Sequence, residues 1–385
     1  MTQIAHAYVG AQIHDGTDLH DGKALIVFRD GTTDIQDQGS LPADCAQQTL
    51  NGGLITPGFV DLQVNGGGGV MFNDDQSVEA LDIIAHAHAS TGTQALLPTL
   101  ITDTPAQTRA AIDAVEQAIA QRIDGIAGLH LEGPHLSIAR KGAHDPALIR
   151  QMEDDDLALM LNAAERIANL MVTVAPENVT NAQIRAMADA GIIVSLGHTD
   201  ADFDTCMAAF DAGARCVTHL FNAMSQLGNR EPGLVGATLQ RDDIHAGLIA
   251  DAIHVHPAAM RTALSAKPNS ETVFLVTDAM ATAGSDIDSF TINGRTVFRR
   301  DHKLTLADGT LAGADLEMPR ALSIMTQQVG DSLTQAITRA TATPASLLRD
   351  RNDLGRLGGA NRTALYFEDG FRDPVVLNDG KQSVE

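Results

Sequence analysis

The sequence predicts an α/β protein in which a (β/α)8 TIM-like barrel carries a small β-sandwich domain built from both chain termini. Eight short apolar segments alternate with mostly helical patterns over roughly 220 to 250 residues, which is typical of such a barrel. Four of these segments end in a carboxylate or an imidazole, and both ends of the chain are β-like. We expect residues 1–55 and 356–385 to form the β domain and residues 56–355 the barrel.

The elements follow in chain order. The first fifty residues give β-like pieces at 4–9 and 24–28, separated by Asp-Gly turns. A buried strand at 54–62 leads into the barrel, and helical patterns such as 78–90, 105–121, 155–168 and 202–212 separate the later strands. The other predicted barrel strands are residues 94–98, 126–131, 170–175, 192–196, 214–218, 245–250 and 273–277.

An insertion is predicted after the eighth strand. Asn293-Gly294 lies between β-prone flanks in residues 289–306, a pattern that favours a β-hairpin. Helical patterns return at 316–329 and 333–349, and β character returns at 362–367 and 374–377. These last strands can complete the β domain only if the two chain ends meet.

Composition excludes several partners. A formal net charge of −23, from 26 Lys and Arg against 49 Asp and Glu, disfavours binding to nucleic acid or to an anionic membrane. No export signal and no apolar run of membrane-spanning length is evident. Cys45, Cys206 and Cys216 lack the spacings of a disulfide framework or a metal knuckle, which is typical of a reducing compartment. We therefore expect a cytoplasmic protein.

Four predicted strands end in Glu132, His198, His219 and Asp278. Because active sites of parallel α/β folds collect at the carboxyl ends of strands, these side chains are candidates for one site. One Glu with two His is a ligand set that suits a catalytic zinc. A single buried His more often has a structural role, but these four residues, each at the end of a strand, together favour a functional site. The pair His86 and His88 lies two residues apart in a helical pattern, so we interpret both as surface residues.

Five local motifs occur in order across most of the predicted barrel. They are Leu131-Glu132-Gly133-Pro134-His135, Lys141-Gly142-Ala143-His144, Gly197-His198-Thr199, Thr218-His219-Leu220-Phe221-Asn222-Ala223-Met224 and Thr277-Asp278-Ala279-Met280. Together they resemble the N-acetylglucosamine-6-phosphate deacetylase family of the amidohydrolase superfamily. The β-like chain ends are also similar to that family's split accessory domain.

The resemblance implies a role for each matching residue. Glu132, His198 and His219 would bind one divalent metal per subunit, expected to be Zn²⁺, with Fe²⁺ or Co²⁺ as alternatives. Asp278 would act as the catalytic acid and base, and His144 would contact the N-acetyl carbonyl. Many amidohydrolases hold a second metal with His-x-His, but here the position is Gln63-Val64-Asn65, whose amides are poor zinc ligands.

Substrate contacts and a partner are implied in the same way. In the resembling family an arginine reaches the phosphate from the neighbouring subunit, so a homodimer with Arg230 in that role is expected. Asp251-Ala252 departs from the Asp-Gly that the family often has beside His254. The expected substrate-binding residues are Ala143, His144, Asn222, Ala223, Arg230, Asp251, His254, Leu311, Ala312, Gly313 and Ala314.

The expected activity is hydrolysis of the N-acetyl amide of N-acetyl-D-glucosamine 6-phosphate to D-glucosamine 6-phosphate and acetate, in amino-sugar catabolism. Two alternatives stay open. One is the same reaction on the galactosamine epimer, because the sequence does not define how a single hydroxyl is read. The other is a non-catalytic sugar-phosphate sensor on the same fold, which would not need Asp278 as a base.

Overall fold

The computed structural model describes residues 3–349, 353–359 and 363–377, and its central feature is an eight-stranded parallel sheet. The strands pair in chain order, and a bridge between Val64 and Ala279 joins the last strand's end to the first strand. All eight predicted barrel strands are therefore confirmed. They are β8 (Phe59–Val64), β11 (Thr93–Ile101), β12 (Leu129–Glu132), β13 (Leu170–Val174), β14 (Ile193–Leu196), β15 (Cys216–Val217), β16 (His245–Ile249) and β17 (Val273–Val276).

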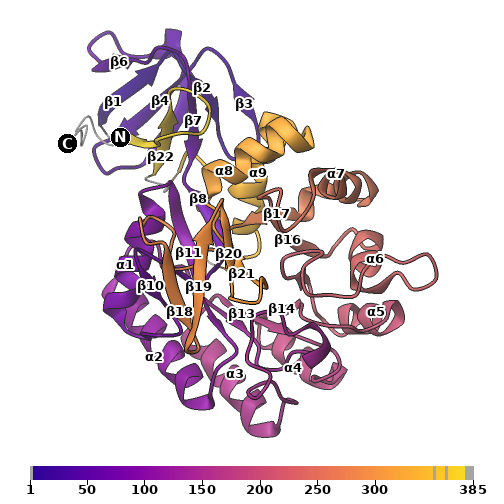
Figure 1. The fold of residues 1–385 in the computed structure, drawn as a ribbon. Coiled ribbons are helices and arrows are strands. Elements are labelled where there is room, and N and C mark those ends of the chain that lie inside the picture. Colours follow the sequence, from indigo (N-terminus) through magenta and orange to yellow (C-terminus); the bar gives the residue numbers. More distant parts are fainter. Residues whose placement is uncertain (1–2, 350–352, 360–362, 378–385) are drawn as a thin grey trace.

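Helices follow the strands and cover the outside of the barrel (Figure 1). Buried aliphatic side chains fill the space between strands and helices. The helices are α1 (Val78–Ala89), α2 (Pro105–Gln121), α3 (Asp154–Arg166), α4 (Asn181–Asp189), α5 (Phe203–Asp211), α6 (Gly233–Gln240), α7 (Pro257–Ala266), α8 (Met318–Ile324), α9 (Leu333–Ala340) and α10 (Ala342–Ala345), with a π-helical turn at Met325–Val329. The described helices do not include one that is long and apolar enough to cross a membrane.

The strands from the two chain ends form two small sheets, which lie at the top of Figure 1. One sheet holds β5 (Thr33–Asp37), β4 (Lys23–Phe28), β1 (Ile4–Val9) and β6 (Gln47–Thr49), in that order. The other holds β23 (Val375–Leu377), β22 (Ala364–Phe367), β7 (Leu54–Pro57), β2 (Gln12–His14) and β3 (Leu19–His20). Because β22 pairs antiparallel with β7, the chain ends meet as predicted. The domain boundaries stay a prediction, and residues 378–385 lie outside the described chain.

The apolar run predicted as one strand at 54–62 is two strands. β7 belongs to the second terminal sheet and β8 to the barrel, and the chain passes between them at Gly58. A Cβ atom at Gly58 would lie 2.3 Å from the Gln94 side chain, so this crossing needs glycine. Continuous hydrophobicity concealed the break, because both strands are buried on both faces.

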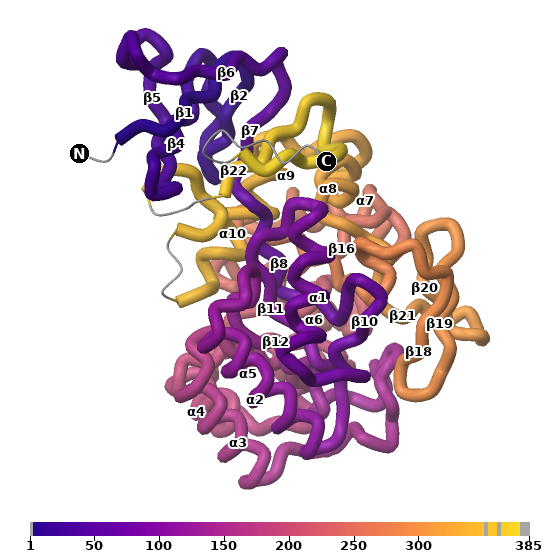
Figure 2. The backbone as a smooth tube through the Cα atoms, turned by 90° about the vertical axis from the view of Figure 1, so that its left-hand side faces the viewer, coloured from indigo at the N-terminus to yellow at the C-terminus, as the bar shows by residue number. Residues whose placement is uncertain are grey.

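The insertion after β17 is a four-stranded sheet rather than a single hairpin. It contains β18 (Ser289–Ile292), β19 (Arg295–Arg300), β20 (Lys303–Thr305) and β21 (Leu311–Ala314). The predicted turn is confirmed: Asn293 and Gly294 have φ angles of 47° and 72° and connect β18 to β19. Figure 2 shows this sheet, in orange, standing at the side of the barrel, and Ala314 bridges to Ala279 beyond β17.

The prediction for His88 was wrong. His88 is 2% exposed and its Nε2 lies 2.9 Å from the carbonyl oxygen of Gly66, whereas His86 is exposed as predicted. The two histidines do face different directions on α1, but His88 shares the buried face with Leu81, Ile84 and Ala85. The prediction treated His88 as exposed because it is polar, although its position in the helix places it on the buried face.

Candidate active site

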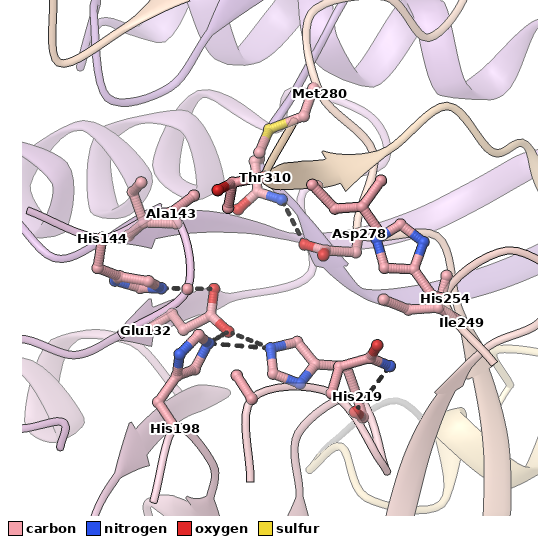
Figure 3. Close-up of a pocket in the computed structure, with 17 residues that line it drawn as sticks. Glu132, Ala143, His144, His198, His219, Ile249, His254, Asp278, Met280 and Thr310 are labelled. Atoms are coloured by element: carbon pink, nitrogen blue, oxygen red, sulfur yellow. Dashed lines mark hydrogen bonds and ion pairs between the residues drawn. The ribbon is translucent and has the colours of Figure 1, made fainter. Parts of the chain in front are cut away.

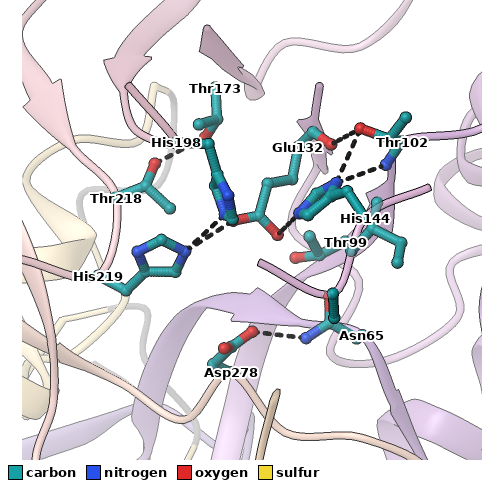
Figure 4. A network of polar contacts seen from close by, with 12 residues as sticks. Asn65, Thr99, Thr102, Glu132, His144, Thr173, His198, Thr218, His219 and Asp278 are labelled. Carbon is teal, nitrogen blue, oxygen red and sulfur yellow. Dashed lines mark hydrogen bonds and ion pairs between the residues drawn. The ribbon is translucent and has the colours of Figure 1, made fainter. Parts of the chain in front are cut away.

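Three side chains from adjacent regions of the barrel converge at its mouth. Glu132 is the last residue of β12, and His198 and His219 follow β14 and β15. Glu132 Oε1 lies 3.2 Å from His198 Nε2 and 3.0 Å from His219 Nε2, and the two Nε2 atoms are 3.0 Å apart (Figure 4). All three residues are buried, being 2%, 4% and 5% exposed. The predicted ligand set is thus brought together in one place.

The donor atoms of this triad fit a metal ion. Donors placed tetrahedrally about 2.1 Å from zinc are separated by about 3.4 Å, close to the spacing seen here. His198 Nδ1 lies 2.9 Å from the carbonyl oxygen of Arg140, which can only accept, so we assign the proton to Nδ1. The Nε2 lone pair of His198 is then free and directed at the other two donors. Such a convergence of lone pairs is satisfied by a cation.

The charges at the triad support the same conclusion. Burial alone would raise the pKa of Glu132, but the hydrogen bonds and charges of His198 and His219 outweigh burial and hold this pKa well below its usual range. Burial likewise opposes a charge on His219, yet Glu132 raises the pKa of that imidazole above its ordinary value. Glu132 is therefore a carboxylate, the form in which it can bind a metal.

Asp278 follows β17 and lies beside the triad. Its Oδ1 accepts hydrogen bonds from Asn65 Nδ2 at 2.7 Å and Gln63 Nε2 at 3.2 Å. Gln63 Nε2 also lies 3.1 Å from Glu132 Oε1, so these amides donate to carboxylates. Burial, reinforced by the charge of Glu132, raises the pKa of Asp278 to about 6. A carboxyl group with this pKa can both take up and release a proton near neutral pH.

His144 lies near Oε2 of Glu132, whereas His198 and His219 contact Oε1. Its Nδ1 accepts from the backbone N–H of Thr102 at 3.3 Å and lies 2.8 Å from Thr102 Oγ1, so we assign its proton to Nε2. Nε2 is 3.9 Å from Glu132 Oε2 and thus faces the site. Burial, followed by the charge of His198, holds the pKa of His144 well below its ordinary value. A neutral imidazole therefore presents an N–H donor to the site.

A buried chain of hydrogen bonds links the strands beside the triad, and Figure 4 shows its contact between Thr173 and Thr218. His130 Nδ1 lies 3.1 Å from the carbonyl oxygen of Leu62, and its Nε2 is 2.7 Å from Thr173 Oγ1. Thr173 and Thr218 are 2.6 Å apart, and Ser195 is 2.7 Å from Thr218. Burial lowers the pKa of His130 to about 4, so it stays neutral near pH 7. The chain ties together the strands that carry Glu132, His198 and His219.

The triad opens into a cavity of about 250 Å³. Eleven of the predicted site residues line it, and Figure 3 shows how the labelled ones surround the space. They are Glu132, Ala143, His144, His198, His219, Asn222, Ala223, His254, Asp278, Leu311 and Gly313. Asn65, Ile101, Gly142, Ile249, Met280 and Thr310 also line the cavity, although sequence reasoning did not name them as binding residues. Gly142 and Thr310 are next to predicted residues in the sequence, and this proximity could have indicated that they line the cavity.

Four predicted substrate contacts lie away from the cavity lining. Ala312 and Ala314 alternate with Leu311 and Gly313 along β21, so their side chains are buried on the other side. Asp251 lies behind His254, where its Oδ2 is 2.6 Å from Nδ1 of that ring. Arg230 is exposed in the loop before α6.

Several cavity residues hold strained backbone. His198, His219 and Asp278 have φ angles of 49°, 30° and 52°, in the left-handed region that side chains other than glycine rarely adopt. Ala252, one residue beyond Asp251, has a φ of 62°. Such strain is concentrated at functional sites, where the side chain is needed despite its backbone cost.

Comparisons with known proteins agree with this geometry. The model of the amidohydrolase family matches residues 54–358. An N-acetylgalactosamine-6-phosphate deacetylase of Shewanella sp. (strain ANA-3) is 42% identical over 88% of this chain and 85% of its own length. An N-acetylglucosamine-6-phosphate deacetylase of Haemophilus influenzae is 33% identical over 91% of this chain and 92% of its own.

A solved structure is similar over nearly the whole chain. The crystal structure of N-acetylglucosamine-6-phosphate deacetylase from Pasteurella multocida has a TM-score of 0.92 and 35% identity, and covers 98% of this chain and 100% of its own. The fold, the strand-end triad and the sequence similarity lead to one conclusion: the chain belongs to the amidohydrolase family.

Proposed function

We propose that this protein is a metal-dependent deacetylase that hydrolyses the N-acetyl amide of an N-acetylhexosamine 6-phosphate, giving the amino-sugar phosphate and acetate. The observation that carries the proposal is the Glu132, His198 and His219 triad with Asp278 and His144 on the same cavity. The names of the similar proteins support the substrate class.

The site residues divide the chemistry between them. Glu132, His198 and His219 would hold one divalent metal, proposed to be Zn²⁺, with Fe²⁺ and Co²⁺ as alternatives. Such an ion, when bound, lowers the pKa of water towards ~7 and so supplies hydroxide near neutral pH. Asp278 takes the proton of the attacking water and delivers it to the amine nitrogen as the C–N bond breaks. His144 donates its Nε2–H to the amide oxygen as negative charge develops there.

We propose N-acetyl-D-glucosamine 6-phosphate as the substrate, in line with the motif resemblance and the similarity to the Pasteurella multocida structure. The galactosamine epimer is a second candidate, favoured by the 42% identical Shewanella relative. The two differ only in the direction of one ring hydroxyl. Acetate release from each epimer by the zinc-loaded protein tests the proposal, and the larger kcat/KM identifies the substrate. If neither epimer releases acetate, the deacetylase proposal is wrong and the sensor hypothesis gains support.

Recognition of the phosphate requires a positive group, and in the described part of the chain no Lys or Arg lines the cavity. We propose that Arg230, which is exposed, reaches the phosphate of a substrate bound to the neighbouring subunit of a homodimer. Arg230→Ala should raise KM for the 6-phosphate by about tenfold or more, because a charge-assisted hydrogen bond is worth roughly 1.5–3 kcal/mol. The unphosphorylated N-acetyl sugar should be affected far less.

Mixed dimers test the direction of this contact. Arg230→Ala and Asp278→Asn subunits, each impaired alone, should regain activity when combined, because one cavity of the hybrid then receives an intact Asp278 and the partner's arginine. Hybrids that stay as impaired as their parents would place the phosphate contact within one subunit or show that no dimer forms.

A further inference from the structure

Arg295 connects the inserted sheet to the wall of the cavity. It is the first residue of β19, directly after the Asn293-Gly294 turn. Its Nη2 donates a hydrogen bond to the backbone carbonyl oxygen of Ala143, a residue 152 positions earlier in the chain that lines the cavity. The contact is charge-assisted, because the guanidinium is always protonated. The insertion therefore reaches the segment that carries His144.

That segment is a tight turn packed against a proposed metal ligand. The carbonyl oxygen of Arg140 lies 2.9 Å from His198 Nδ1, and the N–H of His144 donates to the carbonyl oxygen of Lys141 at 3.0 Å. Gly142 has a φ of 55°, and a Cβ there would lie 3.3 Å from His198 Cε1. His198 thus holds the start of the turn, and Arg295 holds its end next to His144.

The sheet that carries Arg295 is itself firmly attached. Ile292, Val297 and Leu304 are fully buried and belong to one apolar cluster with Met71, Ile101 and Met280 at the barrel mouth. The backbone N–H of Ala314, on β21, donates to the carbonyl oxygen of Asp278 at 2.9 Å. Arg299, on the same strand as Arg295, pairs with Asp315 at 3.0 Å. Because the sheet is held in place, Arg295 can restrain the turn between Arg140 and His144.

We infer that Arg295 is a positioning residue of the deacetylation: through the carbonyl of Ala143 it keeps the imidazole of His144 directed at the reacting amide. The inference rests on the proposed function, in which His144 donates to the amide oxygen. Arg295 does not line the cavity, and its hydrogen bond to the turn is the one to the Ala143 carbonyl; its charge also adds to burial in lowering the pKa of His144. Loss of its contact frees the end of the turn while the triad and Asp278 stay in place. Since His144 acts mainly in the transition state, kcat should fall more than KM changes.

Two variants and a matched control test this. Arg295→Ala removes the contact, and Arg295→Lys keeps a charge and one possible hydrogen bond. Arg300→Ala is the control, because Arg300 lies on the same strand but is exposed, with its guanidinium 5.5 Å from the Phe298 ring centroid. Each protein is measured for hydrogen–deuterium exchange in residues 138–145, for metal content, and for kcat and KM of acetate release.

Arg295→Ala should exchange faster in residues 138–145 and lose about 10- to 100-fold in kcat, with metal content unchanged, because small misplacements of catalytic groups have effects of this size. Arg295→Lys should recover part of the loss, and Arg300→Ala should match the wild type. Unchanged exchange, or faster exchange with normal kcat, would overturn the inference. The exchange measurement needs no substrate, so a wild-type protein that releases no acetate would refute the proposed function separately.

Discussion

The terminal sheets and the barrel mouth differ in how they use left-handed backbone. In residues 3–57, every residue with a positive φ is a glycine, namely Gly10, Gly16, Gly22, Gly31, Gly52 and Gly53. At the barrel mouth the same conformation is adopted by His198, His219, Asp278 and Ala252. A side chain in this region costs roughly 1–2 kcal/mol, a cost that glycine avoids. The N-terminal part of the terminal sheets thus avoids this cost, although Asp373, between β22 and β23, has a φ of 47°, whereas the mouth accepts strain to place particular side chains.

The largest effect should come from removing a side chain at a strained ligand position. His219→Asn should lose the metal and reduce acetate release to background, because two ligands no longer suffice for tight binding. Elemental analysis and the acetate assay measure both effects. His86→Asn is the control, since His86 is exposed on α1 and should change neither. Retention of a full metal complement by His219→Asn would contradict the assigned ligand set.

The next largest effect concerns Asp278. Asp278→Asn should keep the metal but lower kcat by about 10² to 10⁴, the usual contribution of a positioned acid or base. Since the base must be deprotonated and its pKa is raised to about 6, kcat/KM of the wild type should fall as the pH drops below this value. Metal analysis and a pH–rate profile check both expectations. Near-normal turnover in Asp278→Asn would mean that another group moves the proton.

In the terminal sheets, a side chain placed in left-handed backbone should lower the stability of the fold rather than the activity. Gly53→Ala should lower the free energy of unfolding by about 1–3 kcal/mol, because Gly53 has a φ of 80° and the new Cβ would lie 2.4 Å from the Phe367 carbonyl oxygen. Gly52→Ala separates the two causes, since Gly52 has a φ of 82° but no neighbouring atom within 4 Å. Denaturant unfolding measures both. A larger loss in Gly52→Ala than in Gly53→Ala would show that the contact with Phe367 is unimportant.

The smallest effect is expected at Ala252, whose methyl side chain has no chemical role despite its left-handed backbone. Ala252→Gly relieves the φ of 62° but adds the entropy cost of glycine, so the net gain in stability should be under about 1 kcal/mol. His254 should keep its place, because Asp251 Oδ1 accepts from the N–H groups of Ile253 and His254 at 2.8 and 2.7 Å. A thermal unfolding scan measures the change in stability, and the acetate assay shows whether activity is kept. A clear loss of stability would show that the Ala252 methyl packs usefully.

The same contrast separates what the sequence could predict from what it could not. The Asn293-Gly294 turn and the eight apolar strands were predictable, because both depend on neighbouring residues. Glu132, His198, His219 and Asp278 were predictable as a group, since parallel strands bring their carboxyl ends to one edge.

Other features depend on contacts between distant residues. The hydrogen bond from Arg295 to Ala143 spans 152 positions and leaves no periodic pattern. The burial of His88 depends on the Gly66 carbonyl, which lies in a separate loop. The helix α6 was not located, because seven of its eight residues are buried and it lacks the polar face that marks a helix in sequence.

We propose that the barrel mouth holds a single metal ion between Glu132, His198 and His219. Elemental analysis of the purified protein, combined with anomalous difference density at the absorption edge of the metal found, tests this most directly. We predict about one ion per chain, bound by these three side chains, with Gln63 and Asn65 donating to carboxylates instead of binding metal. Two fully occupied metals in the cavity, or a metal bound elsewhere with these three side chains free, would contradict a single metal site at this triad.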